Sequence, residues 1–500
     1  MTRAFGCVAL AAALIVPVVA GAQSPSPVPL PPARAHWEVQ RADAETQRLI
    51  DRGVLMLYAF DVGEARVAFG EALKRDDDLA LASWGEAEAD TIDINLPQSD
   101  AGDKRGAAAV ETGRAHLAHA TPTERALVDA IAKRYAPGSK KERFARYADA
   151  LSAWTASHRD DGNVLTVAAY AIWNAEDTLV DAHDAPSAKS KEMLADLDDA
   201  LKLDPANVGA HHLRIHLLEG LHRSQDAVSD ADALRSYAYP PGTSHLPHMA
   251  GHIWSRLGEY AKMVDDNERA VANDEAWFAQ GDGPGQQYMH AYHDHDVDFV
   301  LYGLTTVGRN DDARAFAKHE DAIMQLKAAL RMHDDARVIA IAKNEGMSGY
   351  FAVAAYVAAA RRGDDAAAQE PHAKIADDKA RLRSPVVEAA TARLAHDTTA
   401  YVAACGRAYD AARNGDLGDP KSSWQLPPGE GYGAALLAAN RPADAEKVFT
   451  AELRRYPSDP HLEWGLAEAQ KALGADDTAA RAAYRSHWKG AHDLTLADLG

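Results

Sequence analysis

Histidines at helical spacing are the residues of this sequence best suited to chemistry. Ten of its 22 histidines fall between His211 and His295. Within that stretch, His212, His216 and Glu219 are separated by four and three residues, so they share one face of a helix. Imidazole nitrogens bind Zn, Cu, Fe or Ni, and a carboxylate one turn further on can be a ligand or orient one. This stripe predicts part of a metal site.

A second stripe lies on the next helix of the same kind. His245, His248 and His252 share one face of a helix for which Ser244 is the expected N-cap. Pro247 is compatible with this helix because it falls in the first turn, where its missing N–H costs nothing. The second stripe therefore predicts three more imidazoles on one line.

The two stripes keep the register of a repeat. His212 and His248 are 36 positions apart, and so are His216 and His252. A tetratricopeptide unit has about 34 residues, so equal offsets place both pairs at equivalent points of adjacent repeats. The axes of neighbouring first helices lie roughly 8–10 Å apart on the concave wall. The two rows are then within reach of one ion, or of two close ions.

A third cluster could complete the shell. His295 and Asp298 are three residues apart and share a helical face, whereas His290 and His293 are expected to be merely nearby. The candidate metal ligands are His212, His216, Glu219, His245, His248, His252, His295 and Asp298. The expected ion is Cu, Fe or Zn. The alternatives are core histidines that satisfy backbone carbonyls, and a pH-sensitive surface.

Other candidates for chemistry are weaker. Glu86, Glu88 and Asp90 alternate along the chain and are expected to form a solvated face. Cys405 lies in an alanine-rich helix and is expected to be a buried small residue. The sequence contains no Walker A loop, GxSxG elbow or HExxH motif, which excludes the standard nucleotide-binding, serine-hydrolase and zincin sites.

Paired helices are the elements that must position these residues. Apolar residues recur three and four apart, and short turns such as Pro137-Gly138-Ser139 separate the segments. Small residues before an aromatic recur in the pairs, for example Ala65 before Phe69, in the pattern of tetratricopeptide repeats. The sequence predicts an all-α, TPR-like, right-handed solenoid of helical hairpins. The charged segment 367–383 is expected to be a loose connection.

Composition limits the function classes. The 500 residues carry a formal charge of −21, with 47% hydrophobic and 25% charged residues, as in an ordinary globular protein. So acidic a chain is unsuited to phosphate backbones, which excludes nucleic acid as the expected partner. No apolar run beyond the N-terminus approaches the roughly 20 residues of a membrane helix.

The N-terminus is expected to direct export. Arg3 precedes an apolar stretch, and Ala20-Gly21-Ala22 supplies small residues for cleavage, so the protein is expected to be periplasmic or secreted. The predicted organisation is a signal peptide at 1–22, a proline-rich linker at 23–36, N-terminal repeats at 37–205, the histidine-rich repeats at 206–320, degenerate repeats at 321–420 and C-terminal repeats at 421–500. The sequence leaves the oligomeric state open.

The chain resembles a family of exported bacterial tetratricopeptide-repeat proteins with a histidine-rich middle. The resemblance rests on residues 57–61 (LYAFD), 212–219 (HLRIHLLE), 245–253 (HLPHMAGHI) and 256–260 (RLGEY). Two positions depart from it, because Val62 and Asp298 stand where the family tends to have histidines. At Asp298 a carboxylate would replace an imidazole, which keeps a ligand at this position but shifts the preference of the site toward harder metal ions. The resemblance implies the fold and a histidine-rich centre, and it implies no particular reaction.

Three functions remain open on this sequence. The first is a metalloprotein whose His/carboxylate site on the concave face catalyses oxidation or hydrolysis, with Glu219 or Asp298 as ligand or base. The second is a metal carrier without turnover. The third is a scaffold that holds a peptide or a small molecule in the concave groove. Histidines on the groove wall favour the metal hypotheses, because peptide-binding grooves usually present Asn, Lys and Arg there.

Overall fold

Helices dominate the computed structural model of the chain. It describes residues 31–91, 99–181, 185–281, 286–376, 379–414 and 424–500, with the side chains of all of these except 286–289, 291, 379, 380 and 414. Within these ranges the β contacts are two isolated bridges, Pro32 with Ala238 and Val180 with Pro186.

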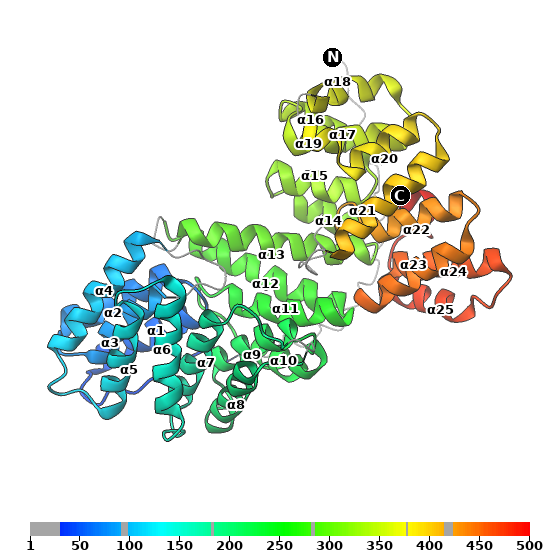
Figure 1. Ribbon diagram of the computed structural model, residues 1–500. Coiled ribbons are helices and arrows are strands. Elements are labelled where there is room, and N and C mark those ends of the chain that lie inside the picture. The colour runs from blue at the N-terminus through cyan, green and yellow to red at the C-terminus, as the bar shows by residue number, and fades with distance from the viewer. Residues whose placement is uncertain (1–30, 92–98, 182–184, 282–285, 377–378, 415–423) are drawn as a thin grey trace, which may run out of the picture.

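The helices follow one another in short hairpins (Figure 1). The first part of the chain forms α1 (Ala44–Tyr58), α2 (Val62–Arg75), α3 (Ala80–Ala89), α4 (Asp100–Ala115), α5 (Pro122–Arg134), α6 (Lys140–Thr155), α7 (Gly162–Ala175) and α8 (Ala188–Leu203). The middle forms α9 (Val208–Gly220), α10 (Val228–Arg235), α11 (His245–Leu257), α12 (Tyr260–Phe278), α13 (Gln286–Thr306), α14 (Asn310–Ala317) and α15 (Ala322–Arg331). The last part forms α16 (Asp335–Asn344), α17 (Gly349–Arg362), α18 (Asp365–Ala376), α19 (Lys379–Leu382), α20 (Pro385–Leu394), α21 (Thr398–Asn414), α22 (Pro428–Ala438), α23 (Pro442–Arg455), α24 (Pro460–Leu473) and α25 (Thr478–His487). Two 3-10 turns span Ser224–Ala227 and Leu496–Asp498.

Local sequence signals set the helix ends. Thr121 with Glu124 and Ser139 with Glu142 form capping boxes at the starts of α5 and α6, which satisfy backbone N–H groups that the helix leaves free. Gly474 ends α24 in the left-handed conformation (φ 72°), which a residue without a Cβ adopts at little cost.

Aromatic rings fill the gaps between helix pairs. The Phe69 ring of α2 packs so closely against Gly53 of α1 and Gly85 of α3 that a Cβ on either glycine would lie 2.7 or 2.5 Å from it. The arrangement recurs in α22, α23 and α24. Because each hairpin buries its apolar face only against its neighbours, the pairs stack into a solenoid. The predicted all-α, TPR-like fold is confirmed.

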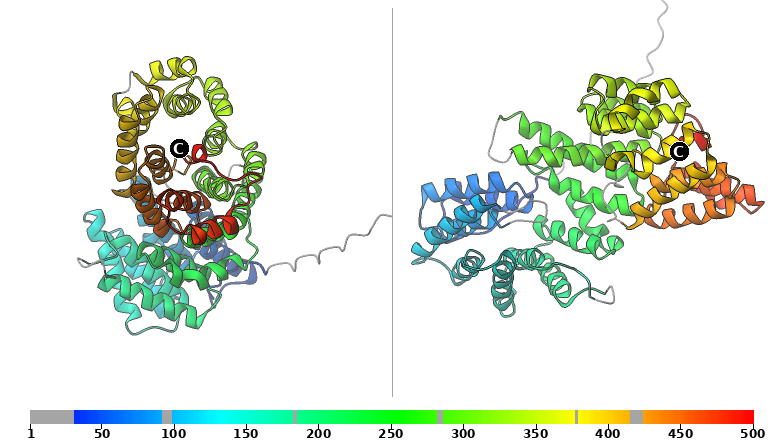
Figure 2. Two further views of the ribbon diagram at one scale, coloured as in Figure 1. Left: turned by 90° about the vertical axis from the view of Figure 1, so that its right-hand side faces the viewer. Right: turned by 45° about the horizontal axis from the view of Figure 1, so that its top comes forward.

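The solenoid has an extended first part and a curled second part. In Figure 1 the helices α1 to α11 follow an arc, and in the left view of Figure 2 the helices after α12 curl into a ring around the C-terminus. The largest apolar core is continuous through the N-terminal and histidine-rich repeats, from Ala35 to Ala328, and also includes Trp424. Three smaller cores lie between Leu326 and Leu499.

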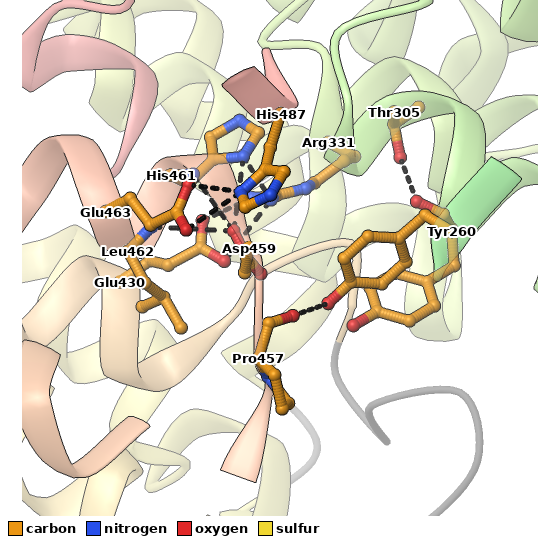
Figure 3. A network of polar contacts seen from close by, with 11 residues as sticks. Tyr260, Thr305, Arg331, Glu430, Pro457, Asp459, His461, Leu462, Glu463 and His487 are labelled. Atoms are coloured by element: carbon orange, nitrogen blue, oxygen red, sulfur yellow. Dashed lines mark hydrogen bonds and ion pairs between the residues drawn. The ribbon is translucent and has the colours of Figure 1, made fainter. Parts of the chain in front are cut away.

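A buried polar junction closes the ring (Figure 3). Arg331 of α15 donates to both carboxylate oxygens of Glu430 on α22, at 2.6 and 3.2 Å, and lies 3.1 Å from His461 Nδ1 on α24. The Tyr260 hydroxyl of α12 donates to the carbonyl of Pro457 at 3.3 Å. Both members of the Arg331–Glu430 pair are buried, and the two hydrogen bonds between them offset part of the cost of removing both charges from water. The junction ties the last repeats to the middle of the chain.

Two segments that were predicted to be irregular contact the rest of the fold. The proline-rich linker was predicted to span residues 23–36, and its described end packs against the fold, because Ala33 N–H donates to the Ala238 carbonyl at 2.7 Å and Ala35 is buried. The segment 367–383 was expected to be a loose connection, but it contributes to α18 and α19 because Ala368 and Ile375 are buried.

Residues 1–30, with the predicted signal peptide and most of the linker, lie outside the described residues. Of the helices in the described ranges, none combines the length and the apolar character that spanning a bilayer requires.

Candidate metal centre

Helix α9 presents the first histidine stripe. The Asn207 side chain caps it by accepting from Ala210 N–H at 2.9 Å. Gly209 allows the ring of Tyr58 to pack against the helix, since a Cβ there would lie 2.5 Å from that ring. The close approach brings the end of α1 to α9, where the Tyr58 carbonyl accepts from His212 Nδ1–H at 2.6 Å.

Helix α11 presents the second stripe. It begins at His245, and Pro247 falls in its first turn as expected. Gly251 lets Asn267 of α12 approach the backbone, because a Cβ there would lie 2.2 Å from the amide nitrogen. Ser244 occupies the N-cap position of this helix, as predicted, but its side chain makes no capping hydrogen bond.

Three rings converge in the first triad, His212, His216 and His245. One nitrogen from each lies within 4.8 Å of the others. His212 Nε2, His216 Nε2 and both ring nitrogens of His245 are buried without a hydrogen-bond partner. Such orphaned groups are rare in folded proteins and point to a missing ion or water. Because the Tyr58 carbonyl accepts a hydrogen bond from Nδ1–H of His212, the Nε2 atom of this neutral ring carries a lone pair.

The second triad, His248, His252 and His295, joins α11 to α13 and meets the same 4.8 Å limit. The Nε2 atoms of His248 and His252 face each other at 2.8 Å. His252 Nδ1 lies 3.1 Å from Glu219 Oε2, and His248 Nδ1 lies 2.7 Å from Asn267 Oδ1. The Asn267 amide donates its Nδ2–H to a backbone carbonyl, which fixes its oxygen toward His248.

Protons on both Nδ1 atoms make both facing Nε2 atoms acceptors. Two nitrogen lone pairs at 2.8 Å repel unless a cation, either a proton or a metal ion, lies between them. The carboxylate and amide partners on the outer nitrogens are the groups that commonly orient metal-bound histidines. The second triad thus has three candidate ligands, and two of them have supporting groups on their outer nitrogens.

The triads adjoin one another. The ring centres of His245 and His248 are 5.5 Å apart, and those of His216 and His252 are 6.5 Å apart. The arrangement offers six imidazoles in two adjacent sets of three.

Each triad has its own phenylalanine, whose ring contacts all three imidazoles of that triad. The Phe60 ring centre lies 4.5, 5.9 and 5.0 Å from those of the first triad. The Phe299 ring centre lies 4.8, 5.0 and 5.1 Å from those of the second triad. Phe60 has φ 64°, a strained conformation for a bulky residue that persists only where the surroundings enforce it. Sequence reasoning missed both rings, which follow from no spacing rule.

Burial keeps these histidines neutral. It lowers the pKa of His212 to about 4 and that of His295 to about 3, and the neighbouring His252 adds to the effect at His295. Burial likewise holds the pKa of His216, His245 and His248 well below the ordinary value. Neutral imidazole is the form that binds a metal ion.

The two predicted carboxylates lie outside the triads. Glu219 bonds to His252 Nδ1 and to Arg256, at 3.1 and 2.9 Å, so it orients a histidine. Asp298 accepts from Lys327 Nζ at 2.7 and 2.8 Å and from Trp424 Nε1 at 3.1 Å. The structure does not bring Asp298 to the histidines, because this cation and this indole hold its carboxylate elsewhere.

A buried acid pair lies behind the second triad. Asp296 Oδ1 is 2.7 Å from His248 Nδ1, and the Asp274 carboxylate is a close electrostatic neighbour of Asp296. Burial and the neighbouring carboxylate raise the pKa of Asp296 well above its usual range. His293 lies 3.6 Å from Asp274 and 3.5 Å from Glu320, and these acids outweigh burial and raise its pKa to about 10. The sequence offered no sign of this pair.

Of the weaker candidates from the sequence, Glu88 differs from its prediction and Cys405 agrees with it. Glu88 was expected on a solvated face, but it is 3% exposed and accepts from the Tyr147 hydroxyl at 2.6 Å. Burial raises its pKa to about 7. Asp90 pairs with Arg105 at 2.6 Å. Cys405 is buried, as expected.

Comparison with known proteins finds only distant structural similarity. No protein-family model matches the chain, and no curated protein matches it. Among solved structures, the human IFIT1 dimer with m7Gppp-AAAA is 12% identical over 90% of this chain and 95% of that chain, with a TM-score of 0.31. The human IFIT1 dimer with PPP-AAAA is 12% identical over 91% and 96%, with a TM-score of 0.32. The P58(IPK) TPR domain is 13% identical over 86% and 99%, with a TM-score of 0.22. Likeness this low carries no weight for function, and the fold rests on the helix pairs of the chain itself.

Proposed function

We propose that this protein binds two transition-metal ions, one in each histidine triad, and uses them in oxidative or hydrolytic catalysis. The observation that carries the proposal is the facing pair of Nε2 atoms of His248 and His252 at 2.8 Å, each ring with its Nδ1 held by a side chain. An ion between them removes the repulsion of the two lone pairs.

The first triad supports the same conclusion energetically. A buried polar atom without a partner costs about 1–3 kcal/mol, and four imidazole nitrogens of this triad are in that state. Core histidines that served packing alone would have partners for these atoms, as His211 has in Asp230 and the Pro205 carbonyl. A metal ion would satisfy three of the four nitrogens at once.

The types of candidate ligand limit which metals the site would bind. All six candidate ligands are imidazoles, which suit Cu, Zn and Fe and disfavour Mg, Ca and Mn. Asp298 was predicted to add a carboxylate ligand, which would favour harder metal ions. Its side chain is instead held by Lys327, so the candidate site has imidazole ligands alone.

Three neutral ligands per ion leave coordination positions for a reactant. Bound ions would supply Lewis acidity, and Cu or Fe would also supply electron transfer. The chain itself would orient the imidazoles through the Tyr58 carbonyl, Asn267 and Glu219. Phe60 and Phe299 would exclude water from one side of each triad. His216, His252 and His295 remain partly accessible, which leaves a way in for a small reactant.

The alternatives fit less well. A carrier needs an exchangeable site, whereas His212, His245 and His248 are buried, and hydrogen bonds hold Nδ1 of His212 and of His248. A helical-repeat fold supports a protein-binding scaffold, but a scaffold gives no reason for converging imidazoles without partners. We also propose that the chain is exported and related to the histidine-rich bacterial proteins it resembles, on the strength of its N-terminal sequence and its two histidine motifs.

Metal content tests the proposal. Protein purified without a polyhistidine tag and reconstituted with Cu(II), Zn(II) or Fe(II) should hold about two equivalents of one of them by elemental analysis, one per triad. The double variants H212A/H216A and H248A/H252A should each lose about one equivalent and keep their helical circular dichroism.

His211→Ala is the matched control. His211 is a buried histidine of the same helix α9, but Asp230 holds it outside the triads, so metal content should not change. If the native protein holds no metal after reconstitution, or if H211A loses as much as the double variants, the proposal fails. Oxidase and hydrolase substrate panels on the loaded protein would separate catalyst from carrier.

A further inference from the structure

A small cavity lies in the N-terminal repeats, apart from the histidine triads. Its walls come from the segment before α1 and from the helices α1, α3 and α7 (Figure 1). The cavity has a volume of about 20 Å³, which holds one water-sized group, and it is partly open to solvent. None of the side chains in its wall is more than 9% exposed. A ligand can therefore place only a small head group inside.

Four aromatic rings make up much of the wall, those of Trp37, Tyr58, Trp84 and Tyr170. The ring centres of Trp37 and Trp84 lie 5.3 Å apart, edge to face. The Tyr58 hydroxyl donates to Asn163 Oδ1 at 2.8 Å, which holds its ring in place. The faces of such rings carry partial negative charge and attract cations. A positively charged group is the polar group that this wall favours.

A buried carboxylate completes the wall. Glu88 is 3% exposed and accepts from the Tyr147 hydroxyl at 2.6 Å. Among the described residues no cation lies within ion-pair distance of it, and Arg134 acts on it only from further away, because Arg134 pairs with Asp103 at 3.0 Å. A buried carboxylate without a paired cation is costly, and a bound cation would lower that cost.

A larger cleft of about 740 Å³ adjoins the cavity, and Trp37 lines both. None of the described residues that line this cleft is Lys or Arg, and five are acidic: Glu38, Glu124, Asp160, Asp161 and Asp204. A cleft lined by one sign of charge raises the local concentration of ions of the opposite sign. Cations are thus concentrated next to the cavity.

We propose that the cavity binds the primary ammonium group of a small alkylamine. The ammonium pairs with the Glu88 carboxylate and contacts the rings of Trp37 and Trp84, and the alkyl chain leaves through the open side. Size decides between the classes of amine. A primary ammonium is about as large as a water molecule, whereas a quaternary ammonium carries three further methyl groups that the cavity has no room for.

Butylammonium chloride serves as the probe. The matched comparisons are 1-butanol, which has the same chain without the charge, and butyltrimethylammonium, which has the same chain and charge on a larger head. Isothermal titration calorimetry on the full chain is done in phosphate buffer at pH 8, where most of the Glu88 carboxylate is charged because burial raises its pKa to about 7. Butylammonium should bind saturably, 1:1 and about tenfold more tightly than either comparison.

Glu88→Gln tests the role of the carboxylate. The variant should weaken butylammonium binding about tenfold and remove the preference for the amine over the alcohol. Glu86→Gln is the matched control, because Glu86 lies on the same helix α3 but reaches toward Gly70 of α2 and does not line the cavity. It should change neither value.

Val167→Phe tests the location without touching the charge. The larger side chain fills the cavity, so butylammonium should lose its binding. The proposal is overturned if the native chain shows no saturable butylammonium binding, which would leave a cavity for water only, or if butyltrimethylammonium binds equally well. It is also overturned if binding survives in folded V167F, or if folded E88Q still prefers the amine. If circular dichroism shows that a variant does not fold, the preference of the native chain among the three probes decides.

Discussion

At the residue scale, Glu219 would support the proposed metal site without being a ligand. Its carboxylate lies 3.1 Å from His252 Nδ1 and 2.9 Å from Arg256 Nε. The bond fixes the ring so that Nε2 points at His248, and the negative charge raises the basicity of the imidazole.

Glu219→Gln should therefore weaken metal binding at the second triad by about 10–100-fold, the usual effect of losing such a partner. The first triad should keep its affinity. Competition with a chromophoric chelator measures both. Asp298→Asn is the control, since Lys327 and Trp424 hold that carboxylate away from the triads. An unchanged affinity in E219Q, or an equal loss in D298N, would contradict these assignments.

The titration of the buried Glu88 is expected to make the stability of the fold depend on pH. Burial raises the pKa of Glu88 to about 7 in the folded chain, whereas a glutamate in the unfolded chain has its ordinary pKa of 4.5. Between these values the folded state binds the extra proton. The contribution of Glu88 to stability is thus fully present below about pH 4.5 and is lost as the pH rises through about 7.

Glu88→Gln removes this titration and keeps an acceptor for Tyr147. The variant should melt at a higher temperature than the native chain at pH 8, and the difference should shrink as the pH falls toward 4.5. Thermal melts across this range measure it. The exposed Glu111, replaced in E111Q, should show no such trend. A pH-independent difference for E88Q would mean that Glu88 does not titrate in this range.

At the scale of the elements, glycine contacts fix how closely the helices approach. The Phe449 ring of α23 lies between α22 and α24, and a Cβ on Gly465 would lie 2.4 Å from it. Gly465→Ala should destabilise the chain by about 1–3 kcal/mol through overpacking. Gly70→Ala is the control, because its Cβ would meet only the flexible end of Glu86, and alanine favours the helix. Denaturant unfolding compares the two, and equal stability of both variants would contradict the packing account.

The histidine stripes show what spacing can and cannot predict. Helical periodicity correctly put His212 with His216 and His248 with His252 on shared faces of α9 and α11. The division into triads was not predictable in the same way. Residues 245 to 252 span roughly 10 Å of helix, too far for one ion, so His245 joins the α9 pair while the rest of its stripe joins His295.

The supporting groups depend on contacts between distant segments. Tyr58 reaches His212 across 154 positions, and Phe60 follows it, because the solenoid curves α1 against α9. No local pattern contains that curvature. Glu88 was misjudged for the same reason, since its burial comes from Tyr147 on α6. Asp298 had the right spacing, but Lys327 of α15 holds its carboxylate.

At the scale of the whole molecule, the solenoid joins an extended first part to a curled second part. The candidate metal centre lies where α9, α11 and α13 adjoin, within the largest apolar core. The end of α1 also reaches this centre, because the Tyr58 carbonyl accepts from His212. The Arg331–Glu430 junction closes the curled part.

The most direct test of the metal centre is anomalous diffraction from crystals of untagged protein loaded with copper or zinc, collected on both sides of the absorption edge. Two peaks are predicted in the histidine-rich repeats, one at bonding distance from nitrogens of His212, His216 and His245, and one from those of His248, His252 and His295. Peaks only at surface histidines, or no peak within the triads of fully loaded protein, would contradict the account.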